Sequence, residues 1–145
     1  AMVEGNIVVE DADNVTIKGY GIVNGGFVKS LPKNYTDKIR RLFNIYKSKN
    51  VLLEGIISLD SHTWDVVPEL CKNIRINNLK IISGNGGDDG IDVVTSSNVL
   101  IENSFIRTKD DCIAVKALRK GYEDSVMTDL LVKNCVFWNA EWGNA

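Results

Sequence analysis

A short repeat without gaps runs through the chain and constrains its fold more than any other feature. Five short segments of equal length begin with Asn or Asp, alternate apolar and other residues, and end in Gly or Asn. They are residues 14–19, 50–55, 73–78, 98–103 and 129–134. Alternation with a period of two predicts a short strand with one buried face. Gly and Asn most readily adopt the left-handed backbone conformation, so the last position predicts a sharp one-residue corner.

A second apolar run follows each corner, and a third short strand is expected to complete each unit. These third strands are predicted at 42–46, 64–67, 91–94 and 112–115. Short strands, one-residue corners and the moderate, uneven intervals between the units predict an all-β chain that forms a right-handed parallel β-helix of about five to six coils. Successive coils would stack about 4.8 Å apart.

The predicted β-helix takes in the whole chain, residues 1–145, as a single partial domain. A loop excursion is expected at 27–38, where the repeat is interrupted and Pro32 occurs. A β-sandwich is the main alternative, but it needs hairpin turns at the recurring corners. Only Asn24-Gly25 and Asn85-Gly86 resemble such turns, and neither lies at a recurring corner.

Composition argues against several classes of protein. The chain has 17 Lys and Arg against 19 Asp and Glu, a net charge of -2, whereas a nucleic-acid partner favours a clustered basic face. Its uninterrupted apolar runs are all short, which argues against a membrane-spanning helix. The three cysteines, Cys71, Cys112 and Cys135, are odd in number and widely spaced, so they predict small core residues rather than disulfides or a zinc site.

Aspartates concentrate in two neighbouring motifs, 87–92 and 109–112. Asp89 and Asp110 are separated by the same interval as Ile91 and Cys112, the first residues of two predicted third strands. Stacking of these strands would place Asp89 over Asp110, with Asp111 beside them. Carboxylates held about 5–6 Å apart repel one another, which is a cost that scaffolding alone does not explain. Paired carboxyl groups of this kind are typical of glycoside hydrolysis. Calcium binding is the alternative, although no dense ligand loop is evident.

These motifs resemble those of glycoside hydrolase family 28, the polygalacturonase-like enzymes. The family pattern runs Asn-Thr-Asp-Gly-Ile-Asp, then Asn-Val-x-Ile-x-Asn, then Gly-Asp-Asp-Cys-Ile-Ala-x-Lys. Residues 87–92, 98–103 and 109–116 correspond to the three blocks, and the resemblance extends over about residues 5 to 138.

The resemblance implies the roles of the site residues. Asp111 would be the general acid, while Asp89 and Asp110 would position and deprotonate the attacking water, with inversion at the anomeric carbon and without a metal or another cofactor. A pectic polysaccharide or oligosaccharide would be the substrate, and the parent protein would be secreted or periplasmic.

Three further residues are predicted to bind substrate. Trp64 is a candidate platform for a sugar ring, with a purely structural aromatic as the alternative. His62 would lie one rung from Asp89 if strand 64–67 stacks on 91–94 with Trp64 level with Ile91. Lys116 ends the third family block, with a solvated turn as its alternative. Arg41 precedes the third strand at 42–46, and both a contact to an acidic glycan and a solvated loop pair with Arg40 are open.

The chain also departs from the family pattern. Gly87-Asp88 replaces Asn-Thr, Lys109 replaces Gly, and neither a His nor an Arg-x-Lys motif follows Asp111. Two alternatives to a pectic hydrolase therefore stay open: a non-catalytic glycan-binding or structural module, including an inactive fragment, and a dextranase-like hydrolase of a neutral glucan. The chain is expected to be a fragment of a longer protein, and self-association through uncapped β-helix ends is expected.

Overall fold

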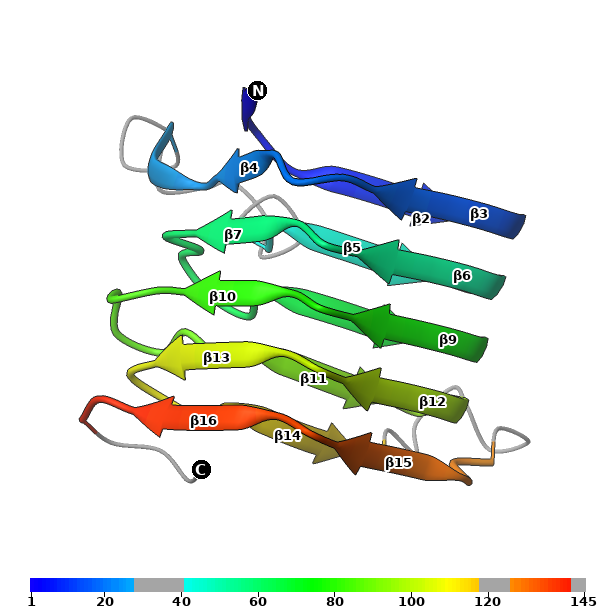
Figure 1. Cartoon of the computed structure of the whole chain (residues 1–145). Coiled ribbons are helices and arrows are strands. Elements are labelled where there is room, and N and C mark those ends of the chain that lie inside the picture. Colours follow the sequence, from blue (N-terminus) through cyan, green and yellow to red (C-terminus); the bar gives the residue numbers. More distant parts are fainter. Residues whose placement is uncertain (28–40, 118–125, 142–145) are drawn as a thin grey trace, which may run out of the picture.

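The computed structural model of the protein describes residues 1–27, 41–117 and 126–141. Within these ranges, sixteen strands form three parallel sheets and run from one end of a stack to the other (Figure 1). Apart from Phe27, the predicted excursion at 27–38 lies outside the described residues. The described part of the chain contains no helix of the length and hydrophobicity needed to cross a membrane.

Each sheet contains one strand from every coil. The six-stranded sheet consists of β1 (Met2–Glu4), β4 (Ile22–Asn24), β7 (Ile57–Leu59), β10 (Lys80–Ile82), β13 (Phe105–Thr108) and β16 (Val136–Asn139). One five-stranded sheet consists of β2 (Ile7–Glu10), β5 (Phe43–Tyr46), β8 (Val66–Glu69), β11 (Ile91–Val94) and β14 (Ile113–Lys116). The other consists of β3 (Asp13–Lys18), β6 (Lys49–Glu54), β9 (Lys72–Asn77), β12 (Ser97–Glu102) and β15 (Leu130–Lys133).

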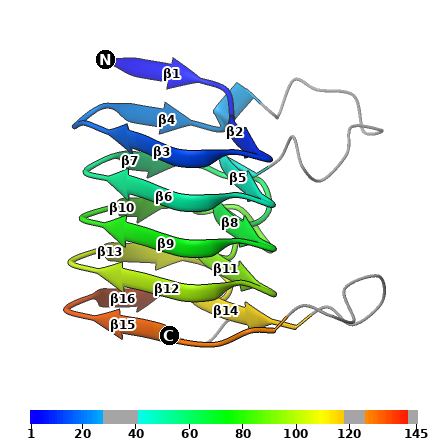
Figure 2. The same ribbon diagram turned by 90° about the vertical axis from the view of Figure 1, so that its right-hand side faces the viewer.

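The chain visits the three sheets in a fixed order, as β5, β6 and β7 show for one coil. Up to the last described coil, every strand pairs in parallel with its counterpart in the next coil, and the coils lie one above another in both views (Figures 1 and 2). The structure therefore confirms the predicted parallel β-helix. Five complete coils, from β2 to β16, are described, and β1 extends the first sheet beyond β4.

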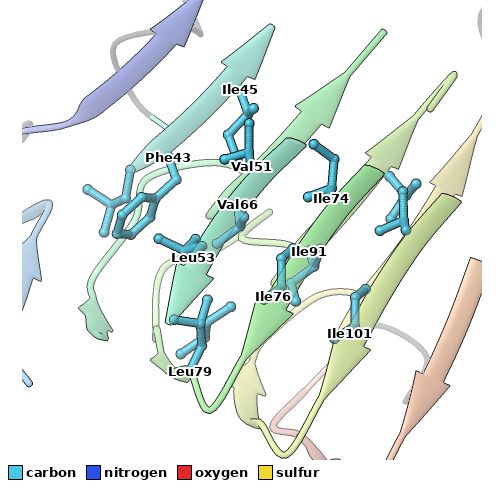
Figure 3. Packing of buried hydrophobic residues seen from close by; sticks show 14 of the residues in the cluster. Phe43, Ile45, Val51, Leu53, Val66, Ile74, Ile76, Leu79, Ile91 and Ile101 are labelled. Atoms are coloured by element: carbon cyan, nitrogen blue, oxygen red, sulfur yellow. The ribbon is translucent and has the colours of Figure 1, made fainter. Parts of the chain in front are cut away.

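The core lies inside the coils, where apolar side chains from equivalent strands stack (Figure 3). On the long strands Val51 and Leu53 pair with Ile74 and Ile76 of the next coil, and all four side chains are almost completely buried. Each such side chain contributes about 1.5–3 kcal/mol through burial. Cys71 and Cys112 are free thiols buried in this core, as the composition predicted, while Cys135 is free and half-buried.

The one-residue corners after the long strands are confirmed. Asn78, Asn103 and Asn134 have φ of 55°, 54° and 52°, and Gly55 has φ of 81°. Gly19 also has a positive φ, 145°, which lies outside the left-handed helical region. The repeat holds a second feature that its sequence did not reveal, because the first residue of each unit is left-handed too. At the five positions 14, 50, 73, 98 and 129, φ lies between 53° and 59°.

Two ladders of side-chain hydrogen bonds run along the stack at these positions. At the start of the long strands, Asn98 Nδ2 donates to Asn73 Oδ1 over 2.7 Å, and Asn73 Nδ2 donates to Asn50 Oδ1 over 2.8 Å. At their ends, Asn134 donates to Asn103 and Asn103 to Asn77. Asn is thus suited to both corners, because it tolerates the left-handed conformation and its amide bonds to the coil before it.

Candidate active site

The candidate site lies on the third kind of connection, the turns that lead from the six-stranded sheet into the sheet containing β8, β11 and β14. Strand register aligns Phe43 with Val66, Val66 with Ile91 and Ile91 with Ile113. The residues two positions earlier therefore fall in one line along the stack, which we call the turn column: Arg41, Trp64, Asp89 and Asp111. Backbone bonds from Asp65 N to Asp89 O and from Gly90 N to Asp111 O continue the register into the turns.

This register corrects two predicted alignments. Ile91 pairs with Ile113 rather than with Cys112, so Asp89 stands level with Asp111 and not with Asp110. Ile91 also pairs with Val66 rather than with Trp64, so Trp64 stands level with Asp89 while His62 stands level with Gly87. The predicted strands at 64–67 and 112–115 begin later than expected because the turns before them contain additional residues.

The three predicted catalytic aspartates do come together. One carboxylate oxygen from each of Asp89, Asp110 and Asp111 lies within 4.8 Å of the other two. The backbone N–H of Asp111 donates to Asp89 Oδ1 over 3.2 Å and to Asp110 Oδ1 over 3.1 Å, which holds the two carboxylates on either side of it. Asp89 is 5% exposed, whereas Asp110 and Asp111 are half-buried and therefore reachable from solvent.

Lys116 links this cluster to the sheet beneath it. Its ammonium lies 2.8 Å from Asp89 Oδ2 and also contacts Asp92 Oδ1. The same Nζ lies 3.5 Å from the centre of the Trp64 ring. Lys116 therefore supplies a positive charge between Asp89, Asp92 and the Trp64 ring, within reach of the turn column.

Buried carboxyl groups surround the cluster. Burial raises the pKa of Asp92 to about 7; the nearby Asp89 adds to the rise, while Lys116 opposes it. Burial also raises the pKa of Asp88, whose oxygens accept hydrogen bonds from the backbone N–H groups of Asn85 and Lys109. One coil earlier, burial raises the pKa of Asp65 to about 7, against a hydrogen bond that Ser58 donates to it over 2.5 Å.

The structure also places the predicted substrate-binding residues. Trp64 and Lys116 lie beside Asp89, and the Trp64 ring already has two cations over it, because Arg41 Cζ is 4.5 Å from the ring centre. The solvated-turn alternative for Lys116 is wrong for its ammonium, which is held by two carboxylates. The solvated alternative for Arg41 is wrong as well, because its side chain is only 13% exposed.

The sequence pattern did not single out Asp65, Asp88 or Asp92 as buried acids. Asp92 occupies a position in a strand where alternation alone predicts an outward, solvated side chain. The predicted register hid its partner: Val94 pairs with Lys116, which places Lys116 diagonally across from Asp92 on the same sheet face, whereas the predicted alignment was one residue off.

The oxygen spacing of the cluster sets what it can hold. A water molecule hydrogen-bonded to two carboxylates spans roughly 5.4 Å, so oxygens within 4.8 Å can share one. Carboxylate oxygens are also calcium ligands, but a cation here would compete with the Lys116 ammonium for Asp89.

Comparison with known proteins defines the class. The family described as Glycosyl hydrolases family 28 matches residues 3–140, and the chain belongs to this family.

Three known proteins show which enzymes of the family the chain resembles. The chain is 30% identical over 115 residues to a polygalacturonase of Medicago sativa, covering 71% of this chain and 27% of that protein. It is 35% identical over 82 residues to a probable rhamnogalacturonase B of Aspergillus niger, covering 56% of this chain and 14% of that protein. A hyperthermoactive exopolygalacturonase from Thermotoga maritima has a similar fold, with a TM-score of 0.69 at 21% identity, covering 91% of this chain and 45% of that structure. The chain spans about a quarter of the length of the curated relatives it matches.

Proposed function

We propose that this chain carries the catalytic face of a glycoside hydrolase that cleaves a pectic polysaccharide. The observation that carries the proposal is the convergence of Asp89, Asp110 and Asp111 within 4.8 Å, with Lys116 against Asp89. Membership of the family supports the reaction class. The names polygalacturonase and rhamnogalacturonase among the relatives support a substrate that contains galacturonate.

Each aspartate has a distinct role in the proposed reaction. Asp89, which is paired with Lys116, orients a water together with Asp110, and the two carboxylates accept its proton. The water oxygen bonds to the anomeric carbon as the glycosidic C–O bond breaks. Asp111 donates a proton to the leaving oxygen, so that one water is consumed and two sugar hydroxyls result.

Inversion remains a prediction from the family resemblance. Carboxyl groups in inverting enzymes are typically about 6.5–9.5 Å apart, whereas one oxygen from each of the three carboxylates here lies within 4.8 Å of the others. NMR of the product in the first minutes of reaction assigns the anomeric configuration directly. The β-anomer from an α-linked substrate would support inversion, and the α-anomer would contradict it.

The decisive experiment separates the acid from the base. Asp111→Asn and Asp110→Asn are compared on polygalacturonate and on galacturonyl fluoride, whose fluoride leaves without a proton. Loss of the acid is expected to abolish polygalacturonate cleavage while sparing the fluoride, because only the first needs protonation. That pattern in Asp110→Asn instead would transfer the role to Asp110, and full activity of both variants would refute the proposed site.

The remaining proposals follow from the same site. A metal is not required, so EDTA is expected to leave the rate unchanged. The substrate is a polysaccharide or oligosaccharide, and the parent protein is secreted or periplasmic. A non-catalytic glycan-binding module would bind oligosaccharides without releasing reducing ends, and a dextranase-like enzyme would release them from neutral glucans. A substrate panel therefore separates the three functions.

A further inference from the structure

A small pocket lies in the turn column beside the aspartates. Its volume is about 170 Å³, and its lining consists of Arg41, Thr63, Trp64 and Gly87. Gly87 belongs to the same turn as Asp89, so the pocket adjoins the catalytic cluster. We propose that this pocket is a subsite that binds the carboxylate of a sugar unit next to the cleaved bond, with Arg41 as its main ligand. The proposal rests on the proposed function for the role of the neighbouring aspartates.

Arg41 is held in place but retains hydrogen-bonding capacity. Its guanidinium lies 4.5 Å from the centre of the Trp64 ring. Its ion pair from Nη1 to Glu69 Oε2 is 3.4 Å long, whereas charge-assisted bonds are usually about 2.7–2.9 Å. A guanidinium stacked on an aromatic ring is pre-organised for a planar carboxylate.

Two of the residues that line this pocket each have a buried polar atom without a partner among the described residues. These atoms are Arg41 Nε and Thr63 Oγ1. A buried donor that lacks a partner destabilises the protein, so two unpartnered polar groups on the lining residues favour a ligand that satisfies them. The Nε edge of a guanidinium and a hydroxyl together match a carboxylate, which offers two acceptor oxygens.

The surrounding charges explain why a cation is needed at this place. Asp89, Asp110 and Asp111 would repel a uronate that approached the cluster. Lys116 is already engaged by Asp89 and Asp92. Arg41 therefore offers the less compensated positive charge, two rungs or about 10 Å along the turn column from Asp89. Arg41 therefore lets the described coils distinguish an acidic sugar from a neutral one.

Two probes with the same number of sugar units test the proposal: trigalacturonate and its full methyl ester, which lacks the negative charges. Binding is measured by NMR titration of the Trp64 indole N–H, in the Asp111→Asn background so that the probe is not consumed. Arg41→Gln is expected to weaken trigalacturonate binding at least about tenfold while changing methyl-ester binding less than about threefold. Arg75→Gln is the matched control, because Arg75 is also paired with a glutamate, Glu102, but lies on β9; it should change neither affinity.

Two milder variants guard against loss of folding in Arg41→Gln, which a thermal melt detects. Arg41→Lys keeps a positive charge but loses Nε, and Thr63→Val removes only the hydroxyl. Each is expected to weaken trigalacturonate binding several-fold. Three results would overturn the subsite. They are unchanged trigalacturonate affinity in both milder variants, equal loss of affinity for the two probes in Arg41→Gln, and no saturable trigalacturonate binding by the Asp111→Asn chain with Arg41 intact.

Failure of the subsite is distinguishable from failure of the proposed function. If only the subsite is wrong, hydrolysis depends on Asp89 while Arg41→Gln leaves KM for polygalacturonate unchanged. If only the hydrolase is wrong, no reducing ends appear, yet trigalacturonate binding still depends on Arg41.

Discussion

The corners that bound the long strands and the turns that lead into β8, β11 and β14 occur on every coil, but they differ in almost every respect. The corners use Asn, Asp or Gly, repeat without insertion, and several have Asn side chains hydrogen-bonded from coil to coil. The turns vary in length and hold buried carboxyl groups and polar atoms without partners among the described residues. Positions that repeat thus stabilise the stack, whereas positions that break the repeat concentrate the chemistry.

The largest expected difference between the two regions is in catalysis. Asp89→Asn should lower the hydrolysis rate by about 10²- to 10⁴-fold, because the amide cannot accept the proton of the attacking water. Asn73→Ala, in a corner ladder, should leave the rate unchanged. Initial rates on polygalacturonate measure both. Equal losses in the two variants would mean that the corners and turns are not functionally separate.

A second test probes the close packing of the turn. A Cβ at Gly90 would lie 2.5 Å from both Cys112 O and Ile106 Cγ2. Gly90→Ala should therefore destabilise the fold by about 1–3 kcal/mol. The matched control is Gly84→Ala, because a Cβ at Gly84 meets nothing within 4 Å and the substitution should not destabilise. Urea unfolding compares the two, and equal stabilities would contradict the packing described for Gly90.

A third test concerns the two corners themselves. Asn103→Val and Asn98→Val should each cost about 1–2 kcal/mol, because a β-branched residue is forced to a positive φ and a ladder bond is lost. Thr16→Val, at an exposed strand position, should change stability by less than about 0.5 kcal/mol. Urea unfolding measures all three. If Asn98→Val behaves like Thr16→Val, then the first corner is less constrained than its backbone indicates.

The fourth test is a pH dependence that arises in the turns. The folded-state pKa of Asp65 is raised from 3.8 to about 7, so the folded protein binds more protons than the unfolded chain between these values. Stability should therefore fall as pH rises from about 4 to 7, with a slope of at most about 1.4 kcal/mol per pH unit for one proton. Asp65→Asn should reduce this slope without removing it, because the pKa of Asp92 is raised as well, whereas Asp13→Asn, in a ladder, should not reduce it. A slope unchanged by Asp65→Asn would contradict the raised pKa.

The difference between corners and turns also decides how much the sequence could predict. The corners were predictable because Asn103 and its equivalents recur at one position in a strict alternation, and that position has one physical solution. The left-handed φ at Asn98 was missed because an Asn before a strand is equally compatible with a simple turn. Its partner in the neighbouring coil, Asn73, becomes informative only when the register is known.

The aspartate cluster could be predicted as a group but not in its internal arrangement. The spacing of the motifs predicted that Ile91 stands level with Cys112, whereas the turn before β14 accommodates one residue more, which brings Asp111 rather than Asp110 level with Asp89. The contacts of Lys116 with Asp89, and of Arg41 with Trp64, depend on side chains that cross between coils. Such contacts have no signature in the local sequence pattern.

The turn column also has a regular spacing. Backbone hydrogen bonds between successive coils fix its spacing, so its equivalent backbone positions are separated by a whole number of rungs of about 4.8 Å. Moving a cation one coil toward or away from Asp89 would shift its reach by one such increment without disturbing the scaffold. If the proposed function holds, substitutions at single turn positions should lengthen or shorten the oligosaccharide recognised beside the cleaved bond in discrete steps.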